Sequence, residues 1–448
     1  MDRSQALGNE PIGKLLWDFS LPAIVGMLVN ALYNIVDSIF VGNGVGEIGL
    51  TAVTIAYPIM LVMMGFGMLI GIGASTLVSI RMGQQNKAAA EKILGNALSL
   101  LLIIAVVFTL GLTLFLDPIL RLLGAEGDVL HYARDFTHII ALGSISLYIG
   151  FGLNNIIRSE GNPRIAMYTM IISAIINIIL NPLFILGLGM GIKGSALATV
   201  IAQTVSAIWV LVYFFGSQSV LKIKAANLRL SGPIVGEIIK IGISPFLMQI
   251  AASVVTLLFN ISLIRYGGDL AVAAYGIVGR VAMLILMPIF GINQGVQPII
   301  GFNYGARNYA RVIEAIKKAV FAGTAFSVVG FIAIHIGDVY IVRLFNNNPD
   351  LISLGAYAIR VVLIMLPLIG FQVVGASYFQ AVGQAGKAAF LSMSRQVILL
   401  IPLIIILPHF YGLDGVWAAS PIADLASALL TGFYLLTEIK RLRRNIVS

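Results

Sequence analysis

One carboxylate, Asp37, lies inside a run of apolar residues that extends over residues 15–41. Helical spacing puts Asn30 and Asn34 on the same face as Asp37, so the run carries one polar stripe. Tyr33 lies one turn before Asp37. A charge at the centre of a membrane helix costs about 2.5–3.5 kcal/mol on insertion scales, and such residues usually face the bundle interior and serve a function. We therefore expect Asp37 to be part of a functional site.

Polar residues in two later apolar runs are candidate partners of this carboxylate. Asn177 and Asn181 are spaced to share one helix face, and Thr199 and Gln203 have the same spacing. Counted from the ends of their runs, Asp37, Asn181 and Thr199 all lie in the outer half of the bilayer. Carboxylate, amide and hydroxyl oxygens suit Na⁺, and a carboxylate can also carry a proton. The alternative for the Asn and Thr residues is hydrogen bonding between helices, although a carboxylate is a costly way to provide it.

The second half of the chain carries two further charges in apolar runs, Arg280 and Asp424. They lie at similar depth, so they could neutralise each other as an ion pair. Alternatively, Arg280 lines a cavity and repels or positions charged cargo. Methionines also recur in these runs, and flexible thioethers suit a surface that binds varied apolar compounds, although helix packing explains single methionines equally well. The candidate cargo-binding residues in these runs are Asn34, Asn154, Gln203, Met60, Met64, Arg280 and Met287.

The composition shows what surrounds these residues. The chain of 448 residues is 59% hydrophobic and 10% charged, with a mean hydropathy of +0.99. Soluble domains are roughly 45–50% apolar and 25% charged, so we predict an all-α polytopic membrane protein. Membrane barrels are excluded because they use shorter, alternating strands. The twelve predicted spans are residues 15–40, 50–79, 93–116, 131–156, 165–187, 192–215, 237–264, 271–301, 315–337, 352–380, 388–409 and 414–437.

Basic residues predict the orientation of these spans. Most of the 28 Lys and Arg residues, among them Lys87, Arg395 and Arg443, fall on the side of the membrane that holds both termini. By the positive-inside rule, both termini should be cytoplasmic. The polar start of the chain lacks the pattern of a cleaved signal peptide, so we expect it to be retained. The net charge of +9 is then an orientation signal, and it gives no support to nucleic-acid binding.

The chain repeats itself at a spacing of about 222 residues. The matched pairs include Pro22 and Pro245, Asp37 and Asn260, Gly73 and Gly295, and Gly83 and Gly305. Each repeat holds an even number of spans, so the halves are parallel and related by an axis along the membrane normal. We predict two pseudo-symmetric six-helix bundles, residues 1–216 and 235–448. A cytoplasmic linker over residues 217–234 joins them, and we expect it to be a solvated connector.

Other chemistry is hard to find in the sequence. The four histidines are scattered singly near the ends of spans, and the chain has no cysteine. Neither a Walker-type nucleotide loop nor the paired acids of an intramembrane enzyme are visible. We therefore expect no cofactor and no metal beyond a coupling ion. Transport would be driven by an ion gradient and not by ATP.

Several short motifs resemble those of the multidrug and toxic compound extrusion (MATE) family. They are VDSIFVG at residues 36–42, the loops RMGQQN and NYGARN, and RSEGNPR at residues 158–164. The likeness covers essentially the whole chain. The sequence as a whole is similar in character to the MepA-type bacterial branch of that family.

The resemblance implies a cation-coupled antiporter that exports amphipathic, often cationic compounds by alternating access, with H⁺ or Na⁺ as coupling ion. By position, it implies a cation site at Asp37 and a hinge in the first helix at Pro22. It also implies cargo contacts at Asn30 and Tyr33. The family's partners in that site match Asn177, Asn181 and Thr199. Asn181 stands where some members have a second Asp, so the pocket holds one negative charge.

Two other functions remain open. A flippase for lipid-linked precursors shares a related helical design, but it would be expected to have a more cationic cavity than Arg280 alone provides. An intramembrane enzyme is opposed by the missing catalytic cluster. For the antiporter, the expected partners are small amphipathic cations and the lipid bilayer of a bacterial or archaeal cytoplasmic membrane. The protein is expected to be a monomer.

Overall fold

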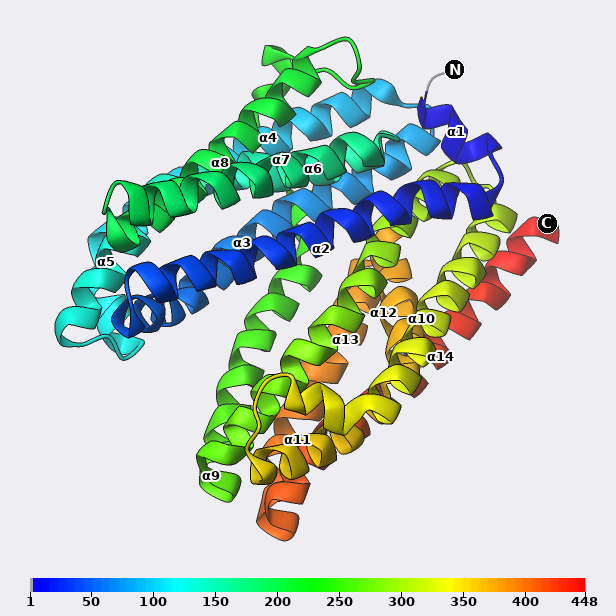
Figure 1. Ribbon diagram of the computed structural model, residues 1–448. Coiled ribbons are helices and arrows are strands. Elements are labelled where there is room, and N and C mark those ends of the chain that lie inside the picture. Colours follow the sequence, from blue (N-terminus) through cyan, green and yellow to red (C-terminus); the bar gives the residue numbers. More distant parts are fainter. Residues whose placement is uncertain (1–2, 448) are drawn as a thin grey trace. The chain divides into compact units, whose positions relative to one another are not determined.

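The computed structural model describes residues 3–447, and these residues form helices without any strand (Figure 1). The helices of the first half are α1 (Arg3–Asn9), α2 (Ile12–Gly44), α3 (Glu47–Gly83), α4 (Lys87–Leu122), α5 (Gly127–Leu142), α6 (Ser144–Ser159), α7 (Pro163–Pro182), the π-helix η1 (Leu183–Gly187) and α8 (Gly191–Phe215). The helices that follow are the 3₁₀-helix η2 (Ala225–Leu228), α9 (Gly232–Gly305), α10 (Tyr309–Arg343), α11 (Pro349–Val362), α12 (Leu366–Ala381), α13 (Ala385–Met393), the π-helix η3 (Ser394–Leu400) and α14 (Ile401–Val447).

These helices make twelve membrane spans. Eight helices of the described chain are long and apolar enough to cross a membrane, and the bent pairs α5 with α6 (55°) and α11 with α12 (46°) bring the number to ten. α9 and α14 are each interrupted by a glycine with positive φ, Gly268 at 65° and Gly412 at 57°. Glycine adopts this conformation without steric cost, so each of these long helices turns there and supplies two spans. The predicted count is confirmed, whereas the bends inside two of the spans were not predicted.

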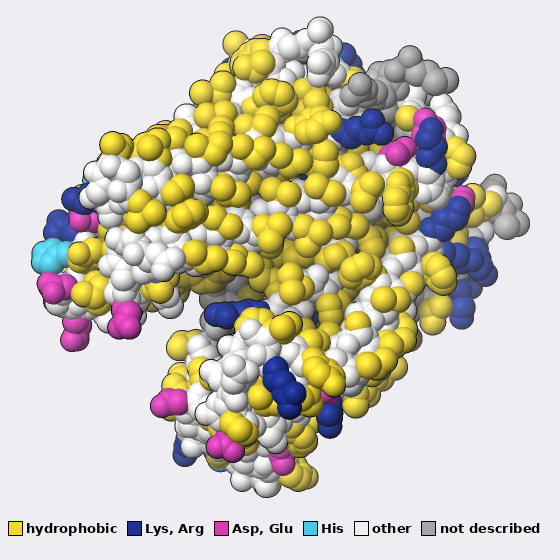
Figure 2. Space-filling view, in the orientation of Figure 1, with side chains coloured by type: hydrophobic (Ala, Val, Ile, Leu, Met, Phe, Trp, Pro, Cys, Tyr) yellow, Lys and Arg dark blue, Asp and Glu magenta, His cyan; other side chains and the backbone are white. Residues whose placement is uncertain are grey.

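Large apolar side chains cover much of the helix surfaces. Leu114, Phe321 and Ile336, for example, are 74%, 75% and 78% exposed. Figure 2 shows hydrophobic side chains over most of the surface in view, while charged side chains gather near helix ends. Exposed apolar belts of this kind are stable only against lipid, so the protein is a multi-pass membrane protein.

The chain divides into two compact units that do not coincide with its two halves. The first unit comprises Val25–Phe246 together with α1, and the second comprises Glu10–Ile24 together with the chain from Leu247 onward. α2 and α9 therefore each belong to both units. The divisions fall close to the matched prolines, Pro22 in α2 and Pro245 in α9. Proline removes a hydrogen bond from the helix ladder, so both crossings coincide with weakened helix.

Close backbone contacts hold each crossing segment in its unit. In the first unit, a Cβ atom on Gly73 of α3 would lie 2.2 Å from the carbonyl oxygen of Ile238 on α9. In the second unit, a Cβ atom on Gly295 of α9 would lie 2.7 Å from the backbone nitrogen of Ser20 on α2. Small residues allow membrane helices to approach this closely. Because Gly73 and Gly295 are a matched pair of the repeat, both units use the same contact.

Candidate functional site

Three helices of the first unit bring polar side chains to Asp37. Oδ1 of Asp37, on α2, accepts hydrogen bonds from Nδ2 of Asn181 near the end of α7 and from Oγ of Ser195 near the start of α8, the latter at 3.0 Å. Asn181 and Ser195 are fully buried, and Asp37 is half-buried. The π-helix η1 begins one residue after Pro182, which follows Asn181. Such irregular turns frequently occur at functional sites.

A second hydrogen-bonded pair lies one helical turn before Asn181 on α7 and one turn after Ser195 on α8. Nδ2 of Asn177 donates to Oγ1 of Thr199 at 3.1 Å, and both side chains are buried. Asn177 and Asn181 share one face of α7, as Ser195 and Thr199 share one face of α8. The structure thus brings Asp37 and its predicted partners into one group, which we call the Asp37 cluster: Asp37, Asn177, Asn181, Ser195 and Thr199.

Two oxygen atoms of the Asp37 cluster lack a hydrogen-bond donor. Oδ1 of Asn177 and Oδ1 of Asn181 are buried and accept no hydrogen bond from the described part of the chain. An unpaired buried acceptor costs about 1–3 kcal/mol, so a bound ion or water would stabilise these two atoms. With one carboxylate, two free amide oxygens and two hydroxyls, the cluster offers the hard oxygen ligands that suit Na⁺. It can equally hold a proton on Asp37.

Ser195 was missed by the sequence analysis. It precedes Thr199 by one helical turn in the motif GSALAT, which is the spacing that identified Thr199 and Gln203. Its signal was therefore present, but serine near the end of an apolar run is too common to be distinctive.

The predicted cargo-binding residues are more dispersed. Nδ2 of Asn34 donates to the backbone oxygen of Asn30 at 2.7 Å and to its Oδ1 at 3.0 Å, so these side chains pair along α2. Asn154 on α6 is buried, and its Oδ1 has no partner among the described residues. The others are Tyr33 one turn before Asp37, Gln203 one turn after Thr199, Met60 and Met64 on α3, and Met287 on α9. All of them stay predicted cargo contacts.

In the second unit, Asp424 pairs with a different arginine from the one predicted. Nε of Arg395 lies 2.5 Å from Oδ1 of Asp424, whereas the guanidinium of Arg280 lies 6.0 Å from the ring centre of Phe345. The predicted pair of Arg280 with Asp424 is therefore wrong. The sequence analysis counted Arg395 among the basic residues at the membrane surface, but it lies in the π-helix η3. Spacing rules for regular helices do not predict such a segment.

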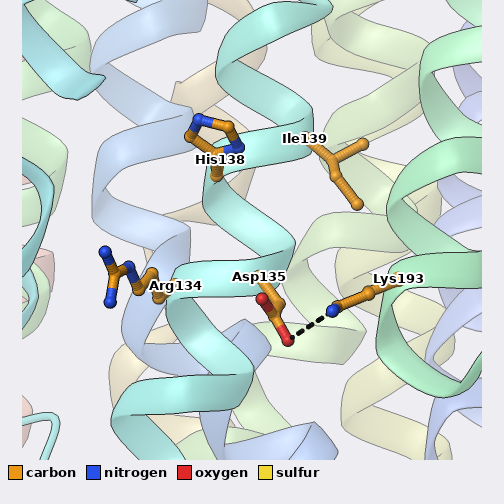
Figure 3. Close-up of a pocket in the computed structure, with 5 residues that line it drawn as sticks. All are labelled: Arg134, Asp135, His138, Ile139 and Lys193. Carbon is orange, nitrogen blue, oxygen red and sulfur yellow. Dashed lines mark ion pairs between the residues drawn. The ribbon is translucent and has the colours of Figure 1, made fainter.

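A separate pocket of about 390 Å³ lies between α5 and the start of α8. Figure 3 shows its lining residues, with Asp135 of α5 facing Lys193 of α8, while Arg134 points away from that pair. Lys193 and Asp135 are 3.2 Å apart, and Arg134 lies 3.3 Å from Asp117. Since both basic residues of the pocket are already paired, it is not a strong site for a charged ligand.

Comparisons with known proteins agree on one family. The family model MatE matches the chain twice, over residues 22–183 and 245–406, which is the repeat predicted from the sequence. Multidrug export protein MepA of Staphylococcus haemolyticus is 30% identical over 96% of this chain and 95% of its own. A solved structure of the MATE multidrug transporter DinF-BH is 41% identical, with a TM-score of 0.90 and 96% coverage of both chains. An outward-facing MATE transporter of the MOP superfamily is 26% identical, with a TM-score of 0.93 and 99% coverage of both chains.

Proposed function

Because the chain belongs to the MatE family of multidrug and toxic compound extrusion transporters, we propose that it exports small amphipathic, often cationic molecules in exchange for H⁺ or Na⁺. It is a transporter and not an enzyme. The names of its relatives and the distribution of Lys and Arg support a bacterial or archaeal cytoplasmic membrane as its location, with both termini in the cytoplasm. We propose that a single chain is sufficient for transport.

The Asp37 cluster is the observation that carries this proposal. It combines one carboxylate with two buried amide oxygens that accept no hydrogen bond in the described chain. Hydrogen bonds between helices would need neither the charge nor the unpaired oxygens, since neutral amides and hydroxyls provide them at lower cost. A bound cation, or a proton on Asp37, accounts for both the carboxylate and the unpaired oxygens.

The geometry also supports a route from ion binding to cargo release. Asn181 and Ser195 both donate to Asp37, which is the arrangement suited to a charged carboxylate. A bound ion competes for that carboxylate, so α7 and α8 must readjust around α2, and the helix is weakest near Pro22. The binding site for cargo at Asn30 and Tyr33 on the same helix then contracts, and the cargo is released. Ion and cargo need not touch, because each shifts the same equilibrium between two conformations.

Dye transport by Asp37→Asn tests this proposal. The variant removes the charge and keeps the shape of the side chain. Asp18→Asn is the matched control, since Asp18 lies on the same helix outside the cluster. In inside-out vesicles supplied with a fluorescent cationic dye, D37N should lose uptake driven by an imposed pH or Na⁺ gradient, whereas D18N should retain it. The gradient that drives the unmodified protein identifies the coupling ion.

Two results would contradict the proposal. Normal gradient-driven transport by D37N would remove Asp37 from ion coupling. Failure of the unmodified protein to move any cationic dye, together with movement of a lipid-linked precursor between leaflets, would favour a flippase.

A further inference from the structure

The motif RSEGNPR contains a buried carboxylate that ion coupling does not use. Glu160 lies between α6 and α7, outside the membrane-spanning segments, and is 0% exposed. Glutamate is almost never fully buried unless it is paired or hydrogen-bonded. Its partners therefore indicate what it holds in place.

Glu160 binds the segment that leads from the first half of the chain to the second. Its Oε1 accepts a hydrogen bond from the hydroxyl of Tyr213 near the end of α8. Its Oε2 accepts from Oγ of Ser219 at 3.0 Å and from the backbone N–H of Leu221 at 3.1 Å. Nδ2 of Asn162, from the same motif, donates to the oxygen of Tyr213. One buried carboxylate thus joins the α6–α7 loop, α8 and the linker.

The far end of the linker is hydrogen-bonded to α4. Oδ1 of Asn96 accepts from the backbone N–H of Ser231 at 2.7 Å, and Oγ of Ser99 donates to the backbone oxygen of Leu228 at 2.7 Å. Leu221 is 0% exposed. The linker is therefore attached to the first unit at both ends, while most of its residues stay exposed, as expected of a solvated connector. Ser231 directly precedes α9, so its attachment fixes where α9 begins.

The burial of Glu160 links its protonation to the attachment of the linker. Burial raises the pKa of Glu160 to about 7, while the hydrogen bonds from Tyr213, Leu221 and Ser219 and the charge of Lys222 act in the opposite direction. Arg158, two residues earlier on α6, directs its guanidinium to Oδ1 of Asn155 at 2.7 Å. When the linker detaches, water reaches the carboxylate and its pKa returns toward the ordinary value. Proton uptake and attachment therefore favour each other.

We propose that Glu160 is a positioning residue that anchors the linker, and with it the start of α9, to the first unit, and that the anchor loosens as the pH on its side of the membrane rises. The first segment of α9 belongs to the first unit and the rest to the second. Movement of this anchor therefore acts on a helix that both units share. The role in transport rests on the proposed function, whereas the anchor itself does not.

Cysteine labelling measures the anchor directly, because the chain has no cysteine of its own. Leu221→Cys places a thiol at a buried linker position, and Gln218→Cys places one at an exposed position three residues earlier. Each variant of the full-length protein in liposomes is reacted with a hydrophilic maleimide between pH 5.5 and 8. The ratio of the two rates cancels the intrinsic pH dependence of the thiol.

The rate of L221C relative to Q218C should rise more than roughly tenfold between pH 5.5 and 8, because the anchor opens as Glu160 ionises. Glu160→Gln should make the ratio independent of pH. Tyr213→Phe keeps the carboxylate but removes one donor to its charged form, so it should move the rise to higher pH. A ratio that does not change with pH in the unmodified background, or an unchanged slope in E160Q, would overturn the proposal.

Transport separates this proposal from the one on ion coupling. D37N should label as the unmodified protein does, because the Asp37 cluster is not part of the anchor. E160Q should keep its requirement for an ion gradient but lose the part of the pH dependence of dye transport that the anchor causes. Unchanged pH dependence of transport in E160Q would refute the role in transport.

Discussion

The packing of α9 against α3 can be tested by one added methyl group. A Cβ atom on Gly242 would lie 1.7 Å from the carbonyl oxygen of Leu69, so Gly242→Ala forces the two helices apart. Gly236 lies on the same segment of α9, and a Cβ atom there would meet no atom within 4 Å. Gly236→Ala is therefore the same chemical change without the clash.

The expected difference follows from these distances. Real Cβ atoms essentially never approach other heavy atoms more closely than 3.0 Å, so the Cβ atom and the Leu69 oxygen must move apart by about 1.3 Å in G242A. Overpacking of this kind typically costs ~1–3 kcal/mol, occasionally more. Replacing glycine by alanine in a helix contributes about 0.5–1 kcal/mol of stability in both variants. G242A should therefore be less stable than G236A by about 1–3 kcal/mol, since the helix term cancels.

Thermal unfolding of both variants in one detergent measures this difference. We expect the midpoint of G242A to lie below that of the unmodified protein and that of G236A to lie at or above it. Equal midpoints for the two variants would mean that α3 and α9 do not meet backbone to backbone at Leu69, and the account of the crossing segments would have to be given up.

Three further predictions concern polar groups. Ser195→Ala removes a hydrogen bond to the Asp37 carboxylate, worth about 1.5–3 kcal/mol. Because that hydrogen bond competes with the coupling ion, half-maximal transport should shift at least tenfold, to lower Na⁺ concentration if Na⁺ couples or to higher pH if a proton does. Ser206→Ala on the same helix should leave half-maximal transport unchanged. Asp424→Asn leaves the charge of Arg395 without its partner and should reduce the yield of folded protein, as measured by size-exclusion profiles. Exchanging the two residues should restore part of that yield. Because the pKa of Glu160 is raised in the folded protein from 4.5 to about 7, its protonated form favours folding. Stability should therefore fall by roughly 3 kcal/mol as pH rises from about 4.5 to 7, and thermal midpoints of E160Q measured across this range should lack that fall.

The spans and the Asp37 cluster were predictable for the same physical reason. A bilayer demands long apolar helices, so hydropathy alone reveals the twelve spans. Within such helices a polar face is rare, and spacing therefore selected Asn177, Asn181 and Thr199 as partners of Asp37. The turns at Gly268 and Gly412 were also foreseeable, because both glycines fall between predicted spans.

Features that depend on irregular backbone or on distant contacts were not predictable. Arg395 reaches Asp424 from a π-helix, where the regular spacing of side chains is lost. Glu160 looked like an ordinary residue of a polar loop, since nothing in RSEGNPR indicates that a linker about 60 residues later folds onto it. The exchange of the ends of α2 and α9 between the two units was not predictable either, because a sequence repeat does not show which half a helix end packs against.

That exchange also bears on how the protein is made. The first unit needs residues up to 246, and the segment Glu10–Ile24 needs partners from beyond Leu247. Chains emerge from the ribosome N-terminus first, so residues 10–24 lack their partners until the segment that contains Gly295 and Arg311 has been synthesised. Neither half can complete a unit alone. An ancestral protein of one half would have needed a second copy of itself to supply the missing helix end, which gives a reason for the two copies to have become joined in one chain.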